Sequence, residues 1–459
     1  MNRKGRHWVL AYLGLLLSAT AVVAQAPSEF ARDVDVLFNR QISEGGPGCA
    51  VAAYHEGAIV LENHYGIANL DYDIPITDET VFYVGSVSKQ FAAATVAMAA
   101  HRGYLSLDDD LREYIPELPE FPETVTPLHL IHHTSGIIDL YTLMDVAGLK
   151  IENLFSDEEA LDLIIGQQEL EFLPGEEFLY SNGGYFLQAV LIERATGLSM
   201  RKFAERYLFE PLGMHDTRFH DTWWEVIPNR AMSYRKVDGE WRIAYLQNFE
   251  RVGPGGLYTT AADMLLWDEN FYSAAVGGPE FVQQLHEVGI LNDGSVTDYA
   301  FGLRLVDHNG LPTVGHSGGF HGFRAHFVRF PEQHFSVLVA CNFEHAEPSL
   351  LATQVAELFL HEEMAPELER FEGSYEAELG ARYHIEMKGG ALHLTRDGRD
   401  RSPVRLRRAG YEPASFRVPG WWRTGMANLT FSEQSAEVTG FVLDMGRGSV
   451  EFIRVSRGN

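Results

Sequence analysis

The sequence predicts an α+β protein, in which an antiparallel sheet flanked by helices is followed by a smaller all-β domain. Three observations support this prediction. Strand-like runs stand at both ends of the region 30–360 with helical runs between them, which suggests one sheet with helices packed on it. From residue 369 to residue 459, short alternating strands replace the helices. The length of 459 residues also exceeds what a single hydrophobic core usually supports.

The elements of the larger region follow from hydrophobic periodicity. A helix-like run opens the region, and a hairpin follows it, with a turn at residues 55–57. Helical patterns then fill the middle, and two strands joined by a proline-bearing turn precede a last helix. The expected helices are 30–42, 89–101, 157–168, 185–196, 200–208 and 351–361, and the expected strands are 49–54, 58–65, 323–329 and 335–342.

The C-terminal region has the pattern of a small antiparallel barrel or sandwich. Tyr383, Ile385 and Met387 alternate with polar residues, Gly389–Gly390 turns the chain, and the alternation then resumes. Further strands are expected at Leu392 and Leu394, Val404 and Leu406, Leu429 and Phe431, Phe441 and Leu443, and Val450 and Phe452. Because this region holds no cluster of charged or catalytic side chains, we expect it to serve packing or oligomerisation.

The N-terminus has the pattern of a secretory signal peptide. Arg3, Lys4 and Arg6 precede an apolar run from Trp8 to Ala24 that ends in small residues. An uncleaved anchor is the alternative, but this run is short for a membrane span. We therefore expect a secreted or periplasmic protein with no integral span in the mature chain. The predicted division is signal peptide 1–24, larger domain 25–362, linker 363–368 and C-terminal β-barrel domain 369–459.

Charge and cysteine content narrow the partners and the compartment. The chain has 36 basic and 64 acidic residues, a net charge of −28, which repels nucleic acid and anionic membranes. Its two cysteines, Cys49 and Cys341, each lie in a strand-like apolar run. Two buried thiols are one interpretation. A disulfide is the other, because export would expose the chain to oxidation and antiparallel neighbours would place the two residues opposite each other.

The first chemical motif is a serine and a lysine three positions apart. Ser86 and Lys89 stand at the start of an apolar helix, where residues i and i+3 are neighbours. A buried lysine loses the solvation of its ammonium group, so its pKa falls. The neutral amine can then accept the proton that a serine hydroxyl must lose to attack a carbonyl. This pair predicts acyl-transfer chemistry.

Two further motifs lie on loops or strand ends. Tyr180 and Asn182 follow a Pro-Gly-Glu stretch and lead into a helix, in a loop position where catalytic groups are commonly presented. His316, Ser317, Gly318 and Gly319 come at the end of a short apolar run, and their glycines let a substrate approach the backbone. Alone, Tyr180 would be a packing residue and His316 a satisfied polar group. The ordered set of three motifs favours a catalytic site.

In this order, the three motifs resemble those of the penicillin-recognising serine hydrolases. That family includes class C β-lactamases, D-alanyl-D-alanine carboxypeptidases, D-aminopeptidases and related esterases. The correspondence is S-x-x-K at Ser86 and Lys89, Y-x-N at Tyr180 and Asn182, and the third motif at His316, Ser317 and Gly318. The resemblance implies a β-lactamase/transpeptidase-like fold with a helical lobe, and the serine between lobe and sheet. The C-terminal module resembles the lipocalin-like domain of CubicO-type peptidases.

The resemblance also implies a role for each residue. Ser86 attacks the carbonyl, and Lys89 and Tyr180 share the proton transfers. Asn182 holds the lysine and the substrate amide, and the backbone N–H groups of Ser86 and Gly319 form an oxyanion hole. We expect the lysine ammonium to favour the phenolate and so to lower the pKa of Tyr180. The substrate-binding set is Asn182, His316, Ser317, Gly318 and Gly319.

One position departs from the β-lactamase pattern. β-Lactamases of this family carry a lysine where the present chain has His316, and that cation helps to hold a substrate carboxylate. Histidine is a weaker and pH-dependent substitute. Versions with His-x-Gly are typical of the D-amino-acid peptidases and esterases of the family.

The sequence therefore predicts an exported serine hydrolase that forms an acyl-Ser86 intermediate on peptides or amides with D-amino acids, of the D-aminopeptidase or D,D-carboxypeptidase type. A carboxylesterase or weak β-lactamase with the same site is one alternative, and a non-catalytic penicillin-binding receptor or scaffold is another. The expected partner is a small peptide, amide or ester, and self-association through the C-terminal domain is a further hypothesis. No cofactor is implied. A zinc site at His316, His321 and His326 is rejected because their spacing fits neither one helix face nor one strand face.

Overall fold

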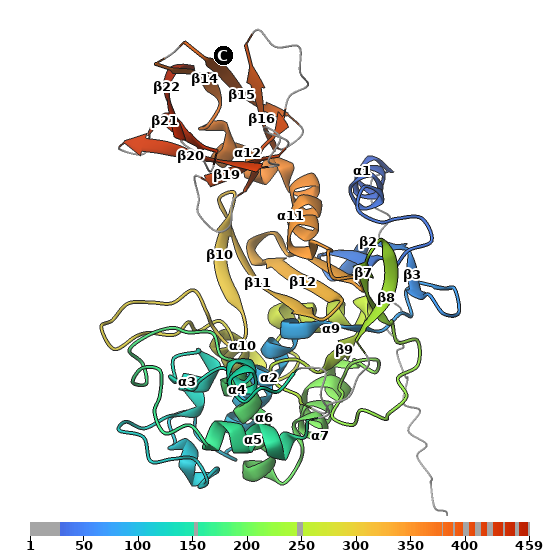
Figure 1. Cartoon of the computed structure of the whole chain (residues 1–459), viewed down its shortest axis with the longest axis vertical. Coiled ribbons are helices and arrows are strands. Elements are labelled where there is room, and N and C mark those ends of the chain that lie inside the picture. The colour runs from blue at the N-terminus through green and yellow to red at the C-terminus, as the bar shows by residue number, and fades with distance from the viewer. Residues whose placement is uncertain are drawn as a thin grey trace, which may run out of the picture.

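The chain folds into a central sheet, a lobe of helices on one side of it, and a smaller β domain at the opposite end (Figure 1). The computed structural model describes residues 28–150, 155–245, 251–378, 380–388, 391–397, 404–408, 415–419, 426–434, 437–445 and 449–457. The expected signal peptide and the turn at Gly389–Gly390 lie outside these residues. Among the helices that are described, none is long and apolar enough to cross a membrane.

The central sheet is antiparallel and joins strands from the two ends of the larger region. Its order is β10-β11-β12-β13-β1-β2, so that the first strand, β1, pairs with the last, β13. This is the arrangement that the sequence predicted from strands at both ends of the region. The strands are β1 Cys49–His55, β2 Ala58–Tyr65, β10 Arg304–His308, β11 Leu311–Phe320, β12 Phe323–Phe330 and β13 Phe335–Cys341.

Both faces of this sheet are covered, and alternate residues serve the two faces. Val51 and its partner Val339 pack against α1 (Ser28–Asn39) and α11 (Pro348–Phe359). The next pair, Ala52 and Leu338, faces the larger core beneath the helical lobe. Because each fully buried aliphatic side chain contributes about 1.5–3 kcal/mol, this register is strongly specified. Two helices lie close to the sheet on that second face, α2 Ser88–His101 and α9 Ala261–Ser273.

The lobe consists of short helices that follow α2 in the chain. Its helix α6 begins at Asn182, three residues earlier than the sequence predicts. The presence of Gly183 and Gly184 explains why the sequence predicts a later start, because glycines disfavour helix interiors. The side chain of Ser181 caps the helix by accepting the Gly184 N–H at 3.1 Å. The lobe helices are α3 Pro127–Ile131, α4 Leu140–Val146, α5 Asp157–Ile165, α6 Asn182–Thr196, α7 Met200–Ala204 and α8 Glu210–Leu212, with a π-helical turn, η3, at Glu205–Phe209.

Small elements connect these layers. The 3₁₀ turn η1, Gly85–Val87, leads directly into α2 and carries the first motif. The other connecting elements are β3 Ile67–Asn69, β4 Ile74–Pro75, β5 Phe82–Tyr83, β6 Arg218–Phe219, β7 Ser233–Val237, β8 Glu240–Tyr245, β9 Leu257–Thr259, α10 Gly278–Gln284, and the 3₁₀ turns η2 Leu111–Glu113 and η4 Pro331–Gln333.

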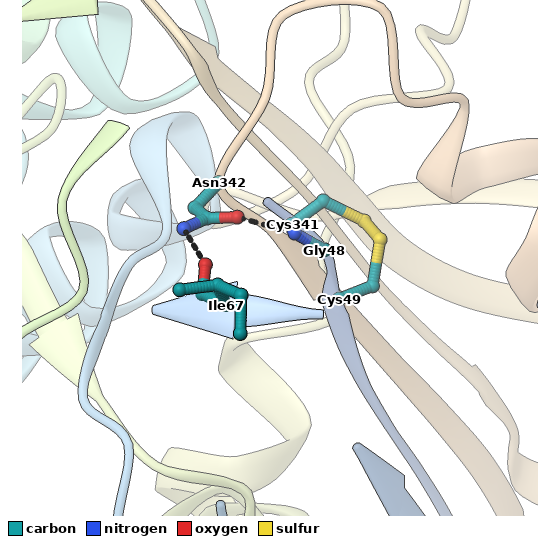
Figure 2. Close-up of a disulfide and its surroundings, with 5 residues drawn as sticks. All are labelled: Gly48, Cys49, Ile67, Cys341 and Asn342. Carbon is teal, nitrogen blue, oxygen red and sulfur yellow. Dashed lines mark hydrogen bonds between the residues drawn. A yellow bond between two sulfur atoms is a disulfide. The ribbon is translucent and has the colours of Figure 1, made fainter. Parts of the chain in front are cut away.

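The two cysteines form a disulfide between adjacent ends of two neighbouring strands of the sheet (Figure 2). Cys49 and Cys341 are direct register partners in β1 and β13, and their Cα atoms are 4.0 Å apart. Of the two interpretations of the sequence, the structure therefore has the disulfide. The neighbouring Asn342 is fully buried, and its side chain accepts from Gly48 N and donates to the Ile67 carbonyl, which ties the same strand ends together (Figure 2).

The C-terminal domain is a curled sheet of nine strands in the described residues. The outermost strands of the sheet, β17 and β18, are separated in the chain only by Leu406, so the sheet curls until its ends meet. Aromatic side chains including Phe371, Tyr375 and Phe431 fill the interior. The strands are β14 Gly373–Ala377, β15 Arg382–Lys388, β16 Ala391–Arg396, β17 Val404–Arg405, β18 Arg407–Arg408, β19 Ser415–Pro419, β20 Met426–Gln434, β21 Glu437–Asp444 and β22 Ser449–Arg457.

The two parts of the chain are joined by a helix, α12 (His361–Glu369), which contains the predicted linker 363–368. Met364 belongs to the core shared by α1, α11 and the central sheet, whereas Leu368 belongs to the core of the curled sheet. The change from one core to the next thus takes one helical turn. The predicted α+β architecture, with a flanked antiparallel sheet and a C-terminal curled sheet, is confirmed.

Candidate active site

The serine motif is held against strand β11 by a contact between two backbones. Gly85 has φ +55°, and a Cβ atom there would lie 2.6 Å from Gly319 N. A Cβ on Gly318 would lie 2.0 Å from the Val84 carbonyl oxygen and 2.9 Å from Ser86 N. Only glycines permit this approach. The contact brings the backbone nitrogens of Ser86 and Gly319 close to each other.

The third motif lies inside β11 rather than after a strand. Glycine and serine have low β-propensity, so residues 315–319 do not look like a strand in the sequence. Their pairing with β12 determines the conformation, with Ser317 opposite His326 and Gly319 opposite Arg324. Along β11, Ser317 and Gly319 are exposed whereas His316 and Gly318 are buried.

Lys89 is fully buried and touches the serine. Its Nζ atom is 3.1 Å from Ser86 Oγ, 2.9 Å from Asn182 Oδ1 and 2.8 Å from the Pro254 carbonyl oxygen. Burial lowers the pKa of the Lys89 amine well below its ordinary value, and the negative charge of Asp139 opposes that shift. The lysine can therefore be neutral when it lies against Ser86 Oγ, as the sequence predicted.

Tyr180, the third predicted catalytic residue, lies in the loop before α6. It lines the same cavity as Ser86, and its ring centroid is 4.7 Å from Lys89 Nζ. Burial raises the pKa of Tyr180 above its ordinary value. The expectation of a lowered pKa was wrong, because burial of the phenol disfavours the charged phenolate. Tyr180 therefore keeps its phenolic proton at neutral pH.

His316 is an uncharged group in this site. Its Nδ1 atom donates to the Ser317 carbonyl oxygen at 2.5 Å, and its Nε2 atom accepts from the Tyr299 hydroxyl at 3.0 Å. Burial, with a smaller contribution from Lys89, lowers the pKa of His316 to about 3. At neutral pH this residue supplies no positive charge, in contrast to a lysine at the same position.

Two residues outside the motifs also support the site. The ring of His133 lies 4.3 Å from that of Tyr180, and its Nδ1 atom accepts the Ser181 N–H at 3.1 Å. Asp139 accepts both the backbone N–H and the side-chain amide of Asn182, at 2.6 and 2.8 Å. Asp139 could not be recognised in the sequence, because the contact joins positions 43 residues apart.

Around these groups lies a cavity of about 850 Å³. Such a volume is near the upper end of the range of about 300–1,000 Å³ that is typical of ligand sites. Two cations line it: Arg304 is paired with Asp298 at 2.8 Å, and Arg324 donates to the carbonyl oxygens of His321 and Phe323. Among the predicted site residues, the cavity wall includes Ser86, Tyr180, His316, Ser317, Gly318 and Gly319.

Lys89 and Asn182 lie behind this wall and reach it through Ser86 and Tyr180. The structure therefore brings all eight predicted site residues into one cluster. Within the residues that are described, no group of three or more His, Cys, Asp or Glu side chains could hold a metal ion.

Comparison with known proteins identifies similar chains. The model of the family described as "Beta-lactamase" matches residues 30–360. A D-aminopeptidase of Gluconobacter oxydans is 28% identical over 362 residues, which cover 76% of this chain and 67% of that protein. A D-aminopeptidase of Brucella anthropi is 28% identical over 304 residues, 65% of this chain and 56% of that protein. The chain thus spans little more than half of the Brucella relative.

The solved structures that resemble this chain include the octameric penicillin-binding protein homologue from Pyrococcus abyssi. The TM-score is 0.63 at 23% sequence identity, and the match covers 92% of this chain and 99% of the other. At this identity, the likeness concerns the fold. It includes the C-terminal sheet, since the match extends well beyond residues 30–360.

Proposed function

The chain belongs to the beta-lactamase family and is a serine hydrolase, and we propose that it cleaves peptides or amides that contain D-amino acids, through an acyl-Ser86 intermediate. The observation that carries the proposal is the buried Lys89 amine, 3.1 Å from Ser86 Oγ. A general base must lie within hydrogen-bond reach of the proton that it removes, and this geometry meets that condition.

In the first half of the reaction, Lys89 Nζ accepts the hydroxyl proton of Ser86 while Oγ attacks the substrate carbonyl. The N–H groups of Ser86 and Gly319 stabilise the negative charge that develops on the carbonyl oxygen. As the carbon–nitrogen bond breaks, Tyr180 donates its phenolic proton to the leaving nitrogen. The proton that Lys89 took from Ser86 then passes to the Tyr180 phenolate.

In the second half, a water molecule attacks the acyl carbon and gives a proton to Lys89. The ester bond to Oγ breaks, and Ser86 recovers its hydroxyl proton. The raised pKa of Tyr180 suits a proton donor to an amide nitrogen, which is a poor leaving group without protonation.

The choice of an aminopeptidase-like substrate rests on two facts. The relatives of known activity that we compared are D-aminopeptidases. In addition, His316 is neutral, so the third motif supplies no positive charge of the kind that a lysine at this position would offer to a substrate carboxylate. A neutral side chain at this position favours substrates without a carboxylate there. This supports D-aminoacyl amides over D,D-carboxypeptidase substrates and β-lactams.

A panel of chromogenic substrates tests the proposal directly. D- and L-aminoacyl p-nitroanilides, a short-chain p-nitrophenyl ester and a chromogenic cephalosporin would be compared on purified protein, with Ser86→Ala as the control. We expect the D-aminoacyl anilides to give the highest kcat/KM. Ester hydrolysis without D-anilide hydrolysis would instead identify a carboxylesterase. If well-folded protein turned over none of the substrates and a fluorophosphonate left Ser86 unlabelled, the receptor alternative would replace the enzyme.

We also propose that the protein is exported. The basic and apolar N-terminal segment and the Cys49–Cys341 disulfide both support passage into an oxidising compartment. Expression of the full chain in a bacterial host, followed by intact-mass measurement of the extracytoplasmic fraction, provides the test. A product that begins at Gln25 is expected, and a cytoplasmic protein of full mass would contradict export.

Self-association through the C-terminal domain is a second proposal of this kind. The Pyrococcus abyssi homologue, whose match extends into this domain, is described as octameric. On β22, Ile453 and Val455 are exposed by 64% and 51%, which is unusual for aliphatic side chains two residues apart on one strand face. Replacement of both by glutamate should shift the mass measured by light scattering towards that of a monomer. An unchanged mass would contradict assembly through this face.

A further inference from the structure

Asp139 makes contact with two helix N-termini at once. Its Oδ1 atom accepts the backbone N–H groups of Tyr141 and Thr142, at 2.9 and 3.3 Å, and so caps α4. Its Oδ2 atom accepts the backbone N–H of Asn182, the first residue of α6, at 2.6 Å, and the Asn182 side-chain amide at 2.8 Å. One carboxylate thus receives four N–H donors.

This contact fixes which end of the Asn182 amide faces the lysine. The NH₂ group of Asn182 points to Asp139, so the opposite atom, Oδ1, faces Lys89 Nζ at 2.9 Å. The reverse orientation would put two oxygens against each other at Asp139 and two nitrogen donors against each other at Lys89. An asparagine can turn its amide in this way only when its partners allow it.

The position of Lys89 Nζ depends in turn on its acceptors. Asn182 Oδ1 and the Pro254 carbonyl hold Nζ from two directions, and the third direction is that of Ser86 Oγ. A lysine side chain has several rotatable bonds and points at one atom only when it is held. Loss of the Asn182 acceptor would therefore weaken the alignment of Nζ with Ser86 Oγ.

We propose that Asp139 is a positioning residue of the active site, which orients the Asn182 amide so that its oxygen holds Lys89 against Ser86. Within the described residues, Asp139 makes no direct contact with the serine or the lysine, so apart from the effect of its charge on Lys89 it acts through Asn182. The inference rests on Ser86 as the nucleophile, and it does not depend on the proposed class of substrate.

The test measures the rate at which a fluorophosphonate labels Ser86 in the full-length protein. Asp139→Asn keeps an oxygen that caps α4, but it offers an NH₂ group to the two N–H donors of Asn182. We expect labelling to slow by about ten-fold or more, because second-layer contacts of this kind control the geometry of reacting groups. The KM for any substrate that the enzyme hydrolyses should change by less than kcat does.

A charge exchange between the two positions provides the matched control. Asn182→Asp alone sets two carboxylates against each other. When Asp139→Asn is added to Asn182→Asp, the introduced amide can again donate to the introduced carboxylate, and the labelling rate should rise. The same change at position 139 should therefore lower the rate in the native chain and raise it in the Asn182→Asp chain. A decrease in both backgrounds would overturn the proposal, because it would show that the two positions act independently.

A third variant, Asp139→Ser, distinguishes the proposed positioning role of Asp139 from a purely structural role in capping α4. Serine also caps a helix but is too short to reach Asn182, so this variant should fold like Asp139→Asn and label Ser86 more slowly than the native protein. A native labelling rate in Asp139→Ser or in Asp139→Asn would overturn the proposal. If wild-type Ser86 is labelled but no D-aminoacyl substrate is hydrolysed, the proposed substrate fails while the role of Asp139 is still decided by these rates.

Discussion

The hydroxyl of Tyr299 donates to Nε2 of His316 over 3.0 Å, and both side chains are buried. Together with the bond from His316 Nδ1 to the Ser317 carbonyl, this contact leaves the imidazole with both nitrogens engaged in its neutral form. His316 therefore links β11 to Tyr299 and, because it is neutral, does not attract an anion.

Removal of this hydroxyl should destabilise the protein. In Tyr299→Phe, the buried Nε2 acceptor loses its donor, which should lower the free energy of unfolding by about 1–3 kcal/mol. Urea denaturation measures the change. Tyr72→Phe is the control, because Tyr72 is 77% exposed and its hydroxyl lies in solvent. Equal midpoints for the two variants would mean that the Tyr299 bond has no net effect.

The pH dependence of the reaction should report Lys89. Its lowered pKa makes the amine available below its ordinary value of 10.5, and the rate should fall as the pH drops through the lowered pKa, because the ammonium cannot accept the serine proton. Lys89→Arg stays charged at every pH and should lose about 10²–10⁴-fold in kcat. A pH–rate profile of kcat/KM measures the acid limb.

His316 provides the control for that profile. Since its pKa is lowered to about 3, it titrates far below the range in which activity is measured. His316→Gln should therefore lower the rate without moving the acid limb. Disappearance of the acid limb in His316→Gln would identify the histidine, and not the lysine, as the titrating group.

The two glycines of the third motif should differ in tolerance. A methyl group at Gly318 would lie 2.0 Å from the Val84 carbonyl oxygen, so Gly318→Ala must push η1 away from β11. We expect it to cost about 1–3 kcal/mol or more of stability. Gly319→Ala meets only the Arg324 side chain at 3.4 Å and should stay within about 0.5 kcal/mol of the native value. Thermal unfolding compares them, and equal losses would contradict the close contact.

The disulfide should contribute strongly to stability. It closes a loop with a sequence separation of 292 residues, and removal of both cysteines as Cys49→Ala with Cys341→Ala should cost about 2–5 kcal/mol. Mass spectrometry after alkylation, with and without reductant, establishes the bond itself. Two alkylated thiols in unreduced, exported protein would contradict it.

The sequence predicts most of the fold because local patterns determine most of it. Continuous apolar runs in β1 and β13 identify strands that are buried on both faces, and their opposed cysteines follow from antiparallel pairing. The strand at residues 315–319 could not be predicted in this way. Its conformation comes from pairing with β12, and the glycines and serine of this segment do not indicate a strand.

The site residues likewise fall into two groups, those that the sequence identifies and those that it does not. Ser86, Lys89 and Tyr180 are recognisable because few residue types perform their chemistry and their spacing is regular. Asp139 and Tyr299 are not recognisable, because their contacts with Asn182 and His316 join positions that are distant in the chain. The direction of the Tyr180 pKa shift was also missed, since it depends on how deeply the phenol is buried, and spacing alone does not reveal burial.

Helix α12 has a mechanical consequence for the molecule. Met364 packs in one core and Leu368 in the next, so the helical turn between them is a short rigid connection rather than a flexible linker. Each residue of an α-helix advances the chain by about 1.5 Å and rotates it by about 100°. A single alanine inserted between these two anchors would rotate the C-terminal domain by about 100° relative to the central sheet. Any surface through which that domain associated with other copies of the chain would then be misoriented.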